Sequence, residues 1–553
     1  MRRALGLLAV YIAFATILLL PWRGLLGHPE VDVWNHAWGY WWVADALGSG
    51  SLPWRTELMG APGGGVLWYV DLVGALGQLP LTVLGGPALA FNVAVVGRVA
   101  LAGLSGHLLA EALSERGPHG WVGGVGFATA PMLLCEVHNG ISEVVAVHWV
   151  GFTLLATAHA LRGHSSRAWV LVGLLGGASV FANFYYGLTA GLLVGVVIVL
   201  HGHSAPGRSL DWRGPVIALA VALPLAIVAL WCLRASVAAP DALVRRSAAL
   251  NTALAEHNAV DPRIYLMPGT FWSVDLEARY GEPFRHTGYL RLSATALALY
   301  ALRRPELRRW GVVALVSMVL GLGPYLWWDE AWVKAGGRLL LLPFGMMQRL
   351  VPELAITHPL RLSVGAQVLV PVLAAAALVG RGRLLAAVAA VALTAETVAL
   401  SVAPWPVPVS PTEVPSIYKE IGASADPRAV LDLPAEVGTT MATSRYFWFQ
   451  TVHHHPVPYK PDARAGSTGD PLTFGYWPQS VGPAGLGSGP GRSLDRLGPT
   501  ELAHLRTVYG WVVLHLELDA RLPSRGRIAA LLEDALGAGE VVEGRQVWRL
   551  PPS

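Results

Sequence analysis

The first side chains that could do chemistry stand just beyond an N-terminal apolar segment. Asp32 is followed by Asn35 and His36, in a stretch that continues with tryptophan and tyrosine as far as Trp42. A carboxylate with hydrogen-bonding neighbours could act there as a general base toward a hydroxyl group. The aromatic residues alone are typical of a membrane-interface belt, which explains the tryptophans better than it explains the polar trio.

A second polar turn separates two later apolar segments and contains Glu136, His138 and Glu143. A carboxylate in the first turn of a helix is favoured by the helix dipole, so Glu143 would serve equally well as a helix-capping residue. Membrane topology nevertheless predicts that this turn and the first loop share one side of the bilayer. Asp32 and Glu143 would then form a pair of acids suited to general-base work, with Glu136 and His138 as substrate-binding neighbours.

Two charged residues fall inside apolar segments, Arg98 and Glu396. A charge near the bilayer centre costs about 2.5–3.5 kcal/mol, which makes each a functional candidate, with pairing or snorkelling as the alternative for Arg98. At the start of a late apolar segment, His358 and Arg361 stand where a lipid phosphate would lie. An arginine there is also an ordinary interfacial anchor.

Other motifs favour no site. The run from His453 to His455 lacks the spacing of zinc ligands, and on a strand only alternate side chains would share a face. The turn from Asn183 to Tyr186 is more typical of an aromatic belt than of a site. Neither a phosphate-binding glycine loop nor a nucleophile elbow occurs.

The elements that must position these residues are membrane helices. Of the 553 residues, 54% are hydrophobic and 14% charged, where soluble domains have about 25% charged residues. The net charge of +4 comes with arginines placed between apolar segments, which positive-inside orientation explains without a nucleic-acid partner. The apolar segments are 4–26, 66–84, 88–113, 121–136, 143–161, 169–185, 187–201, 214–234, 288–302, 310–328, 359–379 and 384–403.

Short turns rich in arginine fix the predicted orientation, with the N-terminus and these turns in the cytoplasm. With the N-terminus inside, these turns are cytoplasmic only if one early apolar segment does not cross the membrane. About eleven membrane-spanning segments then remain. The better candidate is 66–84, because Asp71, Gln78 and Pro80 interrupt it, and the alternative is 121–136. The predicted membrane domain therefore covers 1–403, with outer loops at 27–65 and 235–287.

The remainder, 404–553, has a soluble composition and is expected outside the cytoplasm as an α+β domain. Strands are predicted at Ala429–Leu433 and Val508–Leu516, and a helix at Arg527–Leu536. Val541–Leu550 is expected to form a hairpin around Glu543 and Gly544, and 466–492 to be a loop.

This layout resembles the GT-C superfamily of polytopic glycosyltransferases, which use polyprenyl-phosphate-linked sugars outside the cytoplasmic membrane. Asp32 matches the acid of the first outer loop, segment 66–84 a juxtamembrane helix, and Glu143 (or, as second choice, Glu136) the acid of the next outer loop. The later motifs are similar to those of uncharacterised bacterial GT-C-like membrane proteins: His358-Pro359-Leu360-Arg361, Leu431-Asp432-Leu433-Pro434, Arg445-Tyr446, Gln450-Thr451-Val452-His453 and Val547-Trp548-Arg549-Leu550.

The resemblance implies transfer of a sugar from a polyprenyl-phosphate-linked donor to an envelope glycan, lipid or protein in a bacterial cytoplasmic membrane. Asp32 would be the general base, aligned by Asn35 or His36, and Glu143 would orient the acceptor. Arg361 with His358 would neutralise the departing phosphate. No cofactor is predicted, and the need for a divalent metal is left open.

Two alternatives belong to other classes of protein. A transporter or flippase would carry ionisable residues deep in several spans, of which Arg98 and Glu396 are the chief examples. A non-catalytic relative acting in assembly is the other, since the adjacent acidic pair common in the first loop of the superfamily does not occur here.

Overall fold

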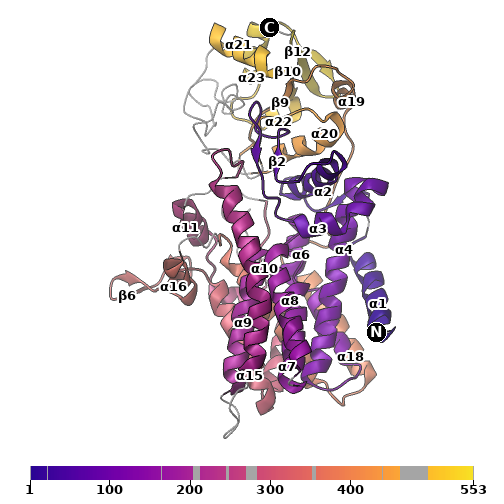
Figure 1. Cartoon of the computed structure of the whole chain (residues 1–553), viewed down its shortest axis with the longest axis vertical. Coiled ribbons are helices and arrows are strands. Elements are labelled where there is room, and N and C mark those ends of the chain that lie inside the picture. The colour runs from indigo at the N-terminus through magenta and orange to yellow at the C-terminus, as the bar shows by residue number, and fades with distance from the viewer. Residues whose placement is uncertain are drawn as a thin grey trace.

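The chain forms a helical bundle with a smaller mixed domain at one end (Figure 1). The computed structural model describes residues 2–20, 23–163, 165–202, 212–244, 248–268, 283–351, 356–438, 440–460 and 496–551. The predicted loop at 466–492 lies outside these residues.

Apolar helices make up the bundle, as expected for chains whose backbone must satisfy its own hydrogen bonds in lipid. They are α1 (Arg2–Leu18), α4 (Leu79–Leu113), α5 (Gly120–Ala128), α6 (Pro131–His138), α7 (His148–Gly163), α8 (Ser166–Ala182), α9 (Phe184–Gly202), α10 (Arg213–Ala238), α14 (Leu292–Ala301), α15 (Pro305–Gly321), α17 (Val364–Ala377) and α18 (Arg383–Leu400).

Within the described residues, six helical stretches are long and apolar enough to cross a membrane. These are Leu79–Leu113, Gly120–His138, Phe184–His201, Arg213–Ala238, Pro359–Ala377 and Arg383–Leu400, and α8 and α14 are shorter apolar helices. The protein is therefore a multi-pass membrane protein, and the remaining predicted spans correspond to helices shorter than this limit.

The segment 66–84 does not form one helix. It contains the end of β3 (Gly65–Val66), the short helix α3 (Leu72–Gly77) and the first turns of α4, which kinks at Gly86 with a φ of +83°. The alternative non-spanning segment, 121–136, lies within α5 and α6 and belongs to the stretches long enough to cross. Buried Arg291 caps the end of α5, where it donates to the carbonyls of Gly126 at 2.6 Å and of Thr129 at 3.4 Å.

The first loop, which the sequence predicts to be outer, is largely structured. It contains β1 (Leu25–Leu26), α2 (Val33–Gly48) and β2 (Arg55–Thr56), which pairs with β3. Later segments between the bundle helices form α11 (Ala248–His257), the 3-10 helix η1 (Pro262–Tyr265), and the hairpins β4 (Trp327–Trp328) with β5 (Ala331–Trp332) and β6 (Lys334–Ala335) with β7 (Arg338–Leu339). They continue with α16 (Pro343–Leu350) and η2 (Pro359–Ser363).

The tail forms a four-stranded sheet in the order β11-β12-β10-β9, in which β9 and β10 are parallel. The strands are β9 (Ala429–Leu433), β10 (Tyr509–His515), β11 (Glu540–Val542) and β12 (Arg545–Arg549). The helices are α19 (Ser416–Gly422), α20 (Arg445–His453), α21 (Pro499–Val508), α22 (Leu516–Asp519) and α23 (Arg527–Leu536). The predicted strands, helix and hairpin are confirmed, and Glu543 and Gly544 at the hairpin turn both have positive φ.

The tail is joined to the first outer loop by backbone pairing and side-chain contacts. β1 pairs antiparallel with β8 (Val409–Ser410), so the start of the first loop and the start of the tail share a small sheet. Next to it, α2 packs against α20, and the Trp38 indole donates to Gln450 at 2.8 Å. The first loop is thus held between the bundle and the tail (Figure 1).

Candidate active site

The first loop and the second polar turn, which carry the two predicted acids, meet at His36. Asp32 is the N-cap residue of α2, and His36 lies one helical turn further on, with its amide donating to the Asp32 carbonyl at 3.3 Å. Asn35 donates to the Asp32 carboxylate at 3.3 Å. The His36 Nδ1 atom is 3.2 Å from the Glu143 carboxyl group, which comes from the turn between α6 and α7.

A glycine lets this turn approach α2 closely. Gly140 has a φ of +66°, and a Cβ atom there would lie 2.5 Å from the Val33 Cβ atom. Val33 is the neighbour of Asp32, so the position of the Asp32 backbone depends on the small size of Gly140.

A buried ion pair supports the same cluster. Arg98 on α4 binds Asp71 at the N-terminus of α3 through two hydrogen bonds, of 2.6 and 2.8 Å. Tyr40 donates to Asp71 at 2.9 Å, and the Ser142 hydroxyl also contacts Asp71. For Arg98 the structure shows the pairing that the sequence left open as the alternative to substrate binding.

Asp71 was not predicted as part of a site. In the sequence, Asp71 only interrupts an apolar segment. The one pattern that points to a role for it is indirect. A buried arginine in a span needs a counter-charge, and Asp71 is the first acid upstream of Arg98 beyond a wholly uncharged segment.

The two carboxyl groups of this cluster have opposite electrostatic environments. Burial raises the pKa of Glu143 to about 8, and the negative charge of Asp71 adds to the effect, against the opposing charge of Arg361. Burial would also raise the pKa of Asp71, but the charge and hydrogen bonds of Arg98 outweigh it and lower that pKa. At neutral pH, Asp71 is therefore charged and Glu143 holds a proton in the unliganded protein.

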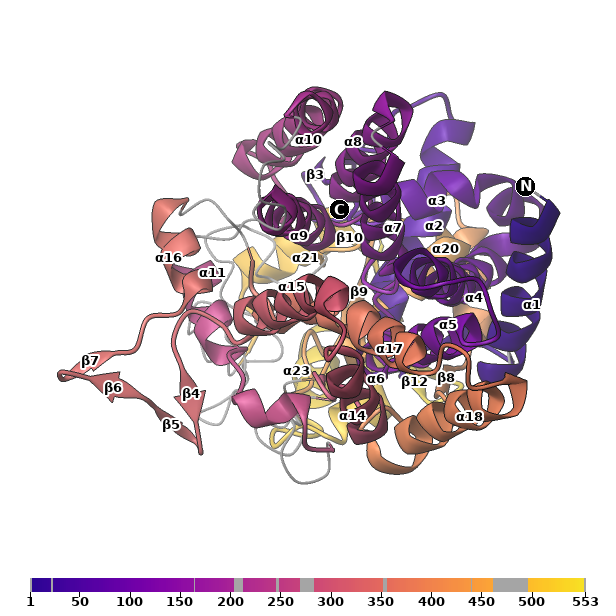
Figure 2. The same cartoon turned by 90° about the horizontal axis from the view of Figure 1, so that it is seen from below.

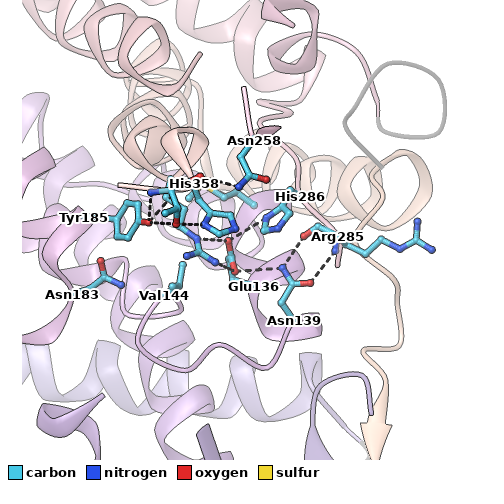
Figure 3. A network of polar contacts seen from close by, with 12 residues as sticks. Glu136, Asn139, Val144, Asn183, Tyr185, Asn258, Arg285, His286 and His358 are labelled. Carbon is cyan, nitrogen blue, oxygen red and sulfur yellow. Dashed lines mark hydrogen bonds and ion pairs between the residues drawn. The ribbon is translucent and has the colours of Figure 1, made fainter. Parts of the chain in front are cut away.

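A second cluster centres on Glu136 of α6, beside a small pocket (Figure 3). Buried Arg361 donates to its carboxylate at 3.2 and 3.3 Å, and the His286 Nδ1 atom lies at 3.6 Å. Asn139 donates to the same carboxylate at 3.4 Å and bonds both backbone groups of Arg285, which fixes the segment that carries His286.

The segment before α17 also lines this pocket. The His358 ring is 5.5 Å from that of His286, and Asn258 donates to the Thr357 carbonyl at 2.8 Å. His286, His358, Asn258 and Arg361 all line the pocket together with Glu136. His286 and Asn258 come from a long outer loop without any spacing motif, which is why sequence reasoning missed them.

Tyr185 belongs to this cluster, contrary to the expectation that its turn is only an aromatic belt. Its ring lies 5.6 Å from the Arg361 guanidinium carbon, and its hydroxyl contacts the Thr357 hydroxyl at 3.1 Å. Figure 3 shows Tyr185 and His286 on opposite sides of the Glu136 carboxylate. An aromatic face beside a guanidinium attracts it and helps to fix its orientation.

The remaining predicted residues lie elsewhere. His138 packs its ring 5.2 Å from that of His28 and contacts the Pro283 carbonyl, so it supports the turn and does not line the pocket. Glu396 on α18 binds the backbone amides of Leu292 and Ser293 and thereby caps α14. In that place the glutamate has a structural partner at a helix N-terminus.

The three consecutive histidines lie at the end of a helix, not on a strand. His453 is the last residue of α20 and His454 has a left-handed backbone. The premise of alternating strand faces was therefore wrong. Across the part of the chain that the structure describes, no group of three or more histidine, cysteine or acidic residues is arranged to hold a metal ion.

Comparisons with known proteins yield matches among solved structures. No protein-family profile matches the chain, and no curated sequence does. The oligosaccharyltransferase of Archaeoglobus fulgidus, tethered to an acceptor peptide, is 13% identical, with a TM-score of 0.49 over 96% of this chain and 71% of that one. Its complex with an inhibitory peptide and a dolichol-phosphate has a TM-score of 0.48 over the same shares.

ArnT from Cupriavidus metallidurans, bound to undecaprenyl phosphate, is 14% identical, with a TM-score of 0.47 over 98% of this chain and 97% of that one.

Proposed function

We propose that this protein is an integral membrane glycosyltransferase that moves a sugar from a polyprenyl-phosphate-linked donor to an acceptor. The observation that carries the proposal is the proximity of two unlike clusters at one end of the bundle. Arg361, His286 and His358 line a pocket together with Glu136, and Arg361 acts electrostatically on Glu143 in the neighbouring acid cluster.

In this mechanism the donor phosphate binds to Arg361, His358 and His286. The bond between the anomeric carbon and the phosphate oxygen breaks, and its electron pair stays on the phosphate, where the cation stabilises the developing charge. Glu136 keeps the Arg361 guanidinium oriented through its paired hydrogen bonds.

The acceptor hydroxyl attacks the anomeric carbon while Asp32 removes its proton, so a new bond between carbon and oxygen replaces the broken one. Asn35 holds the Asp32 carboxylate. Glu143, which carries a proton near neutral pH, orients the acceptor as a hydrogen-bond donor beside His36.

The proposed location is a bacterial cytoplasmic membrane, with the N-terminus inside and the site and tail outside. The helices α7, α14 and α17 begin close to the candidate site, so their far ends, near Arg162, Arg303 and Arg381, lie at the opposite end of the bundle. Basic turns at that end support a cytoplasmic placement. The acceptor would be an envelope glycan, lipid or protein.

Asp32→Asn tests the chemistry. We expect cells with this variant to accumulate lipid-linked sugar and to lose the modified envelope component, at unchanged protein level, because general-base catalysis contributes about 10²–10⁴-fold. Asp45→Asn, at an exposed position of the same helix, is the matched control and should behave as wild type. Full transfer by Asp32→Asn would remove Asp32 from the mechanism, whereas movement of the lipid-linked substrate without bond formation would indicate a flippase.

A further inference from the structure

Residues 325–351, here named the lateral arm, leave the bundle sideways. The arm consists of the two hairpins β4–β5 and β6–β7 followed by α16. In Figure 1 it lies beside the bundle helices, below the tail, and Figure 2 shows it reaching outward beyond them. For helices that cross a membrane, this direction is in the plane of the bilayer.

The arm exposes apolar side chains that no other described part of the chain covers. Trp328 is 47% exposed, Met346 52% and Leu350 83%. Leu339, Leu340 and Val351 are also exposed. A projecting apolar surface of this kind marks contact with a membrane or a partner.

The polar residues of the arm distinguish between these two occupants. Lys334, Arg338 and Arg349 are exposed beside the apolar residues, and Trp327 packs edge-on against Trp332 at 4.7 Å. The exposed acids are Asp329 and Glu330, of which Asp329 is paired with Arg263 at 3.0 Å. Tryptophan with lysine and arginine next to exposed leucine is the composition of a membrane interface, where rings sit at the headgroups and cations reach phosphates.

We propose that the lateral arm is an interfacial anchor that lies in the boundary between lipid headgroups and acyl chains. Its exposed leucine, methionine and tryptophan side chains contact acyl chains, and Lys334, Arg338 and Arg349 bind lipid phosphates. A basic amphipathic element lying in the interface plane gains both hydrophobic and electrostatic binding energy. The inference concerns the arm alone and does not depend on the proposed transferase activity.

The test places a spin label on the arm of the full chain in nanodiscs of phosphatidylethanolamine and phosphatidylglycerol. Met346→Cys and Leu340→Cys are each labelled in a Cys232→Ala background, which leaves buried Cys135 as the remaining native thiol. Val541→Cys, 64% exposed on the tail, is the matched control. We expect both arm labels to collide more with oxygen than with a water-soluble nickel chelate, and the tail label to show the reverse.

Arm labels with the same accessibility as the tail label would overturn the proposal, because they would place the arm in water. Labels shielded from both reagents, with dipolar coupling between two copies in one disc, would also overturn it and would assign the arm to a dimer interface. The tail label reports in the same samples that the protein is folded.

Discussion

At the residue scale, the candidate site depends on how buried charges are compensated. Asp71 is paired with Arg98, and Glu136 with Arg361. Glu143 has no arginine or lysine partner among the described residues; its neighbour is His36 at 3.2 Å, and burial keeps the carboxyl group protonated. A buried acid is either paired with a cation or protonated, because an isolated charge is costly in a low dielectric.

Replacing one partner of the Asp71–Arg98 pair should lower the free energy of unfolding more than replacing both. Asp71→Asn leaves the arginine charge buried and unpaired, which we expect to lower the free energy of unfolding by about 3–5 kcal/mol. The double variant Asp71→Asn with Arg98→Met should recover a large part of that loss. Thermal unfolding in detergent measures both, and a double variant no more stable than Asp71→Asn would contradict the ion-pair account.

The raised pKa of Glu143 predicts a pH dependence of stability. The folded protein keeps this proton until about pH 8, whereas the unfolded chain loses it near the usual value of 4.5. Since the folded state binds more protons in that window, the free energy of unfolding should fall as pH rises through it, by up to about 1.4 kcal/mol per pH unit. Below the window the full stability is present.

Glu143→Gln should remove this slope, because glutamine cannot lose a proton. Unfolding by denaturant across the pH window checks the prediction, with exposed Glu57→Gln as the control that keeps the slope. Since glutamine resembles the protonated acid, we also expect Glu143→Gln to retain more sugar transfer near pH 7 than Glu143→Ala. Equal slopes in Glu143→Gln and wild type would show that another group is responsible.

At the element scale, local sequence patterns predicted individual strands and turns better than the contacts between distant segments. Short apolar runs were sufficient to predict β9 and β10, and Glu543-Gly544 marked the hairpin turn, where both residues adopt positive φ. The partners of Glu136 could not be predicted in this way. His286 and Arg361 contact it from segments far apart in sequence. Local periodicity contains no information about such long-range contacts.

The turn between α6 and α7 gives an element-scale prediction at Gly140. A methyl group there would press on Val33 and would also require an unfavourable positive φ. Gly140→Ala should therefore destabilise the protein by about 1–3 kcal/mol and displace Asp32 from the acceptor. Both thermal unfolding and accumulation of lipid-linked sugar would report the change.

Gly48→Ala is the matched control, because Gly48 ends α2 with open space around its Cα atom. It should leave stability and transfer close to those of wild type. A Gly140→Ala protein with normal stability and transfer would show that the contact with Val33 does not position the first loop.

At the scale of the whole molecule, the tail and the bundle share the first outer loop. Composition predicted the boundary near residue 403, but it does not predict how the tail contacts the rest of the chain. In the structure the tail contacts the first loop through the β1–β8 pairing, the Arg521–Glu30 ion pair at 2.7 Å and the fully buried amide of Gln450. Because α2 carries Asp32 and His36, the tail helps to hold the proposed base in place.

Gln450→Ala should loosen this contact without unfolding either part. The Gln450 amide accepts from the Trp38 indole and donates to the carbonyls of Leu58 and His455. Leaving these buried groups unpaired costs about 1–3 kcal/mol, so amide hydrogen exchange in α2 should accelerate about tenfold. Gln546→Ala, which breaks a bond to Glu533 within the tail, should leave exchange in α2 unchanged. If both variants affected α2 equally, the tail would stabilise the first loop through its overall fold and not through this contact.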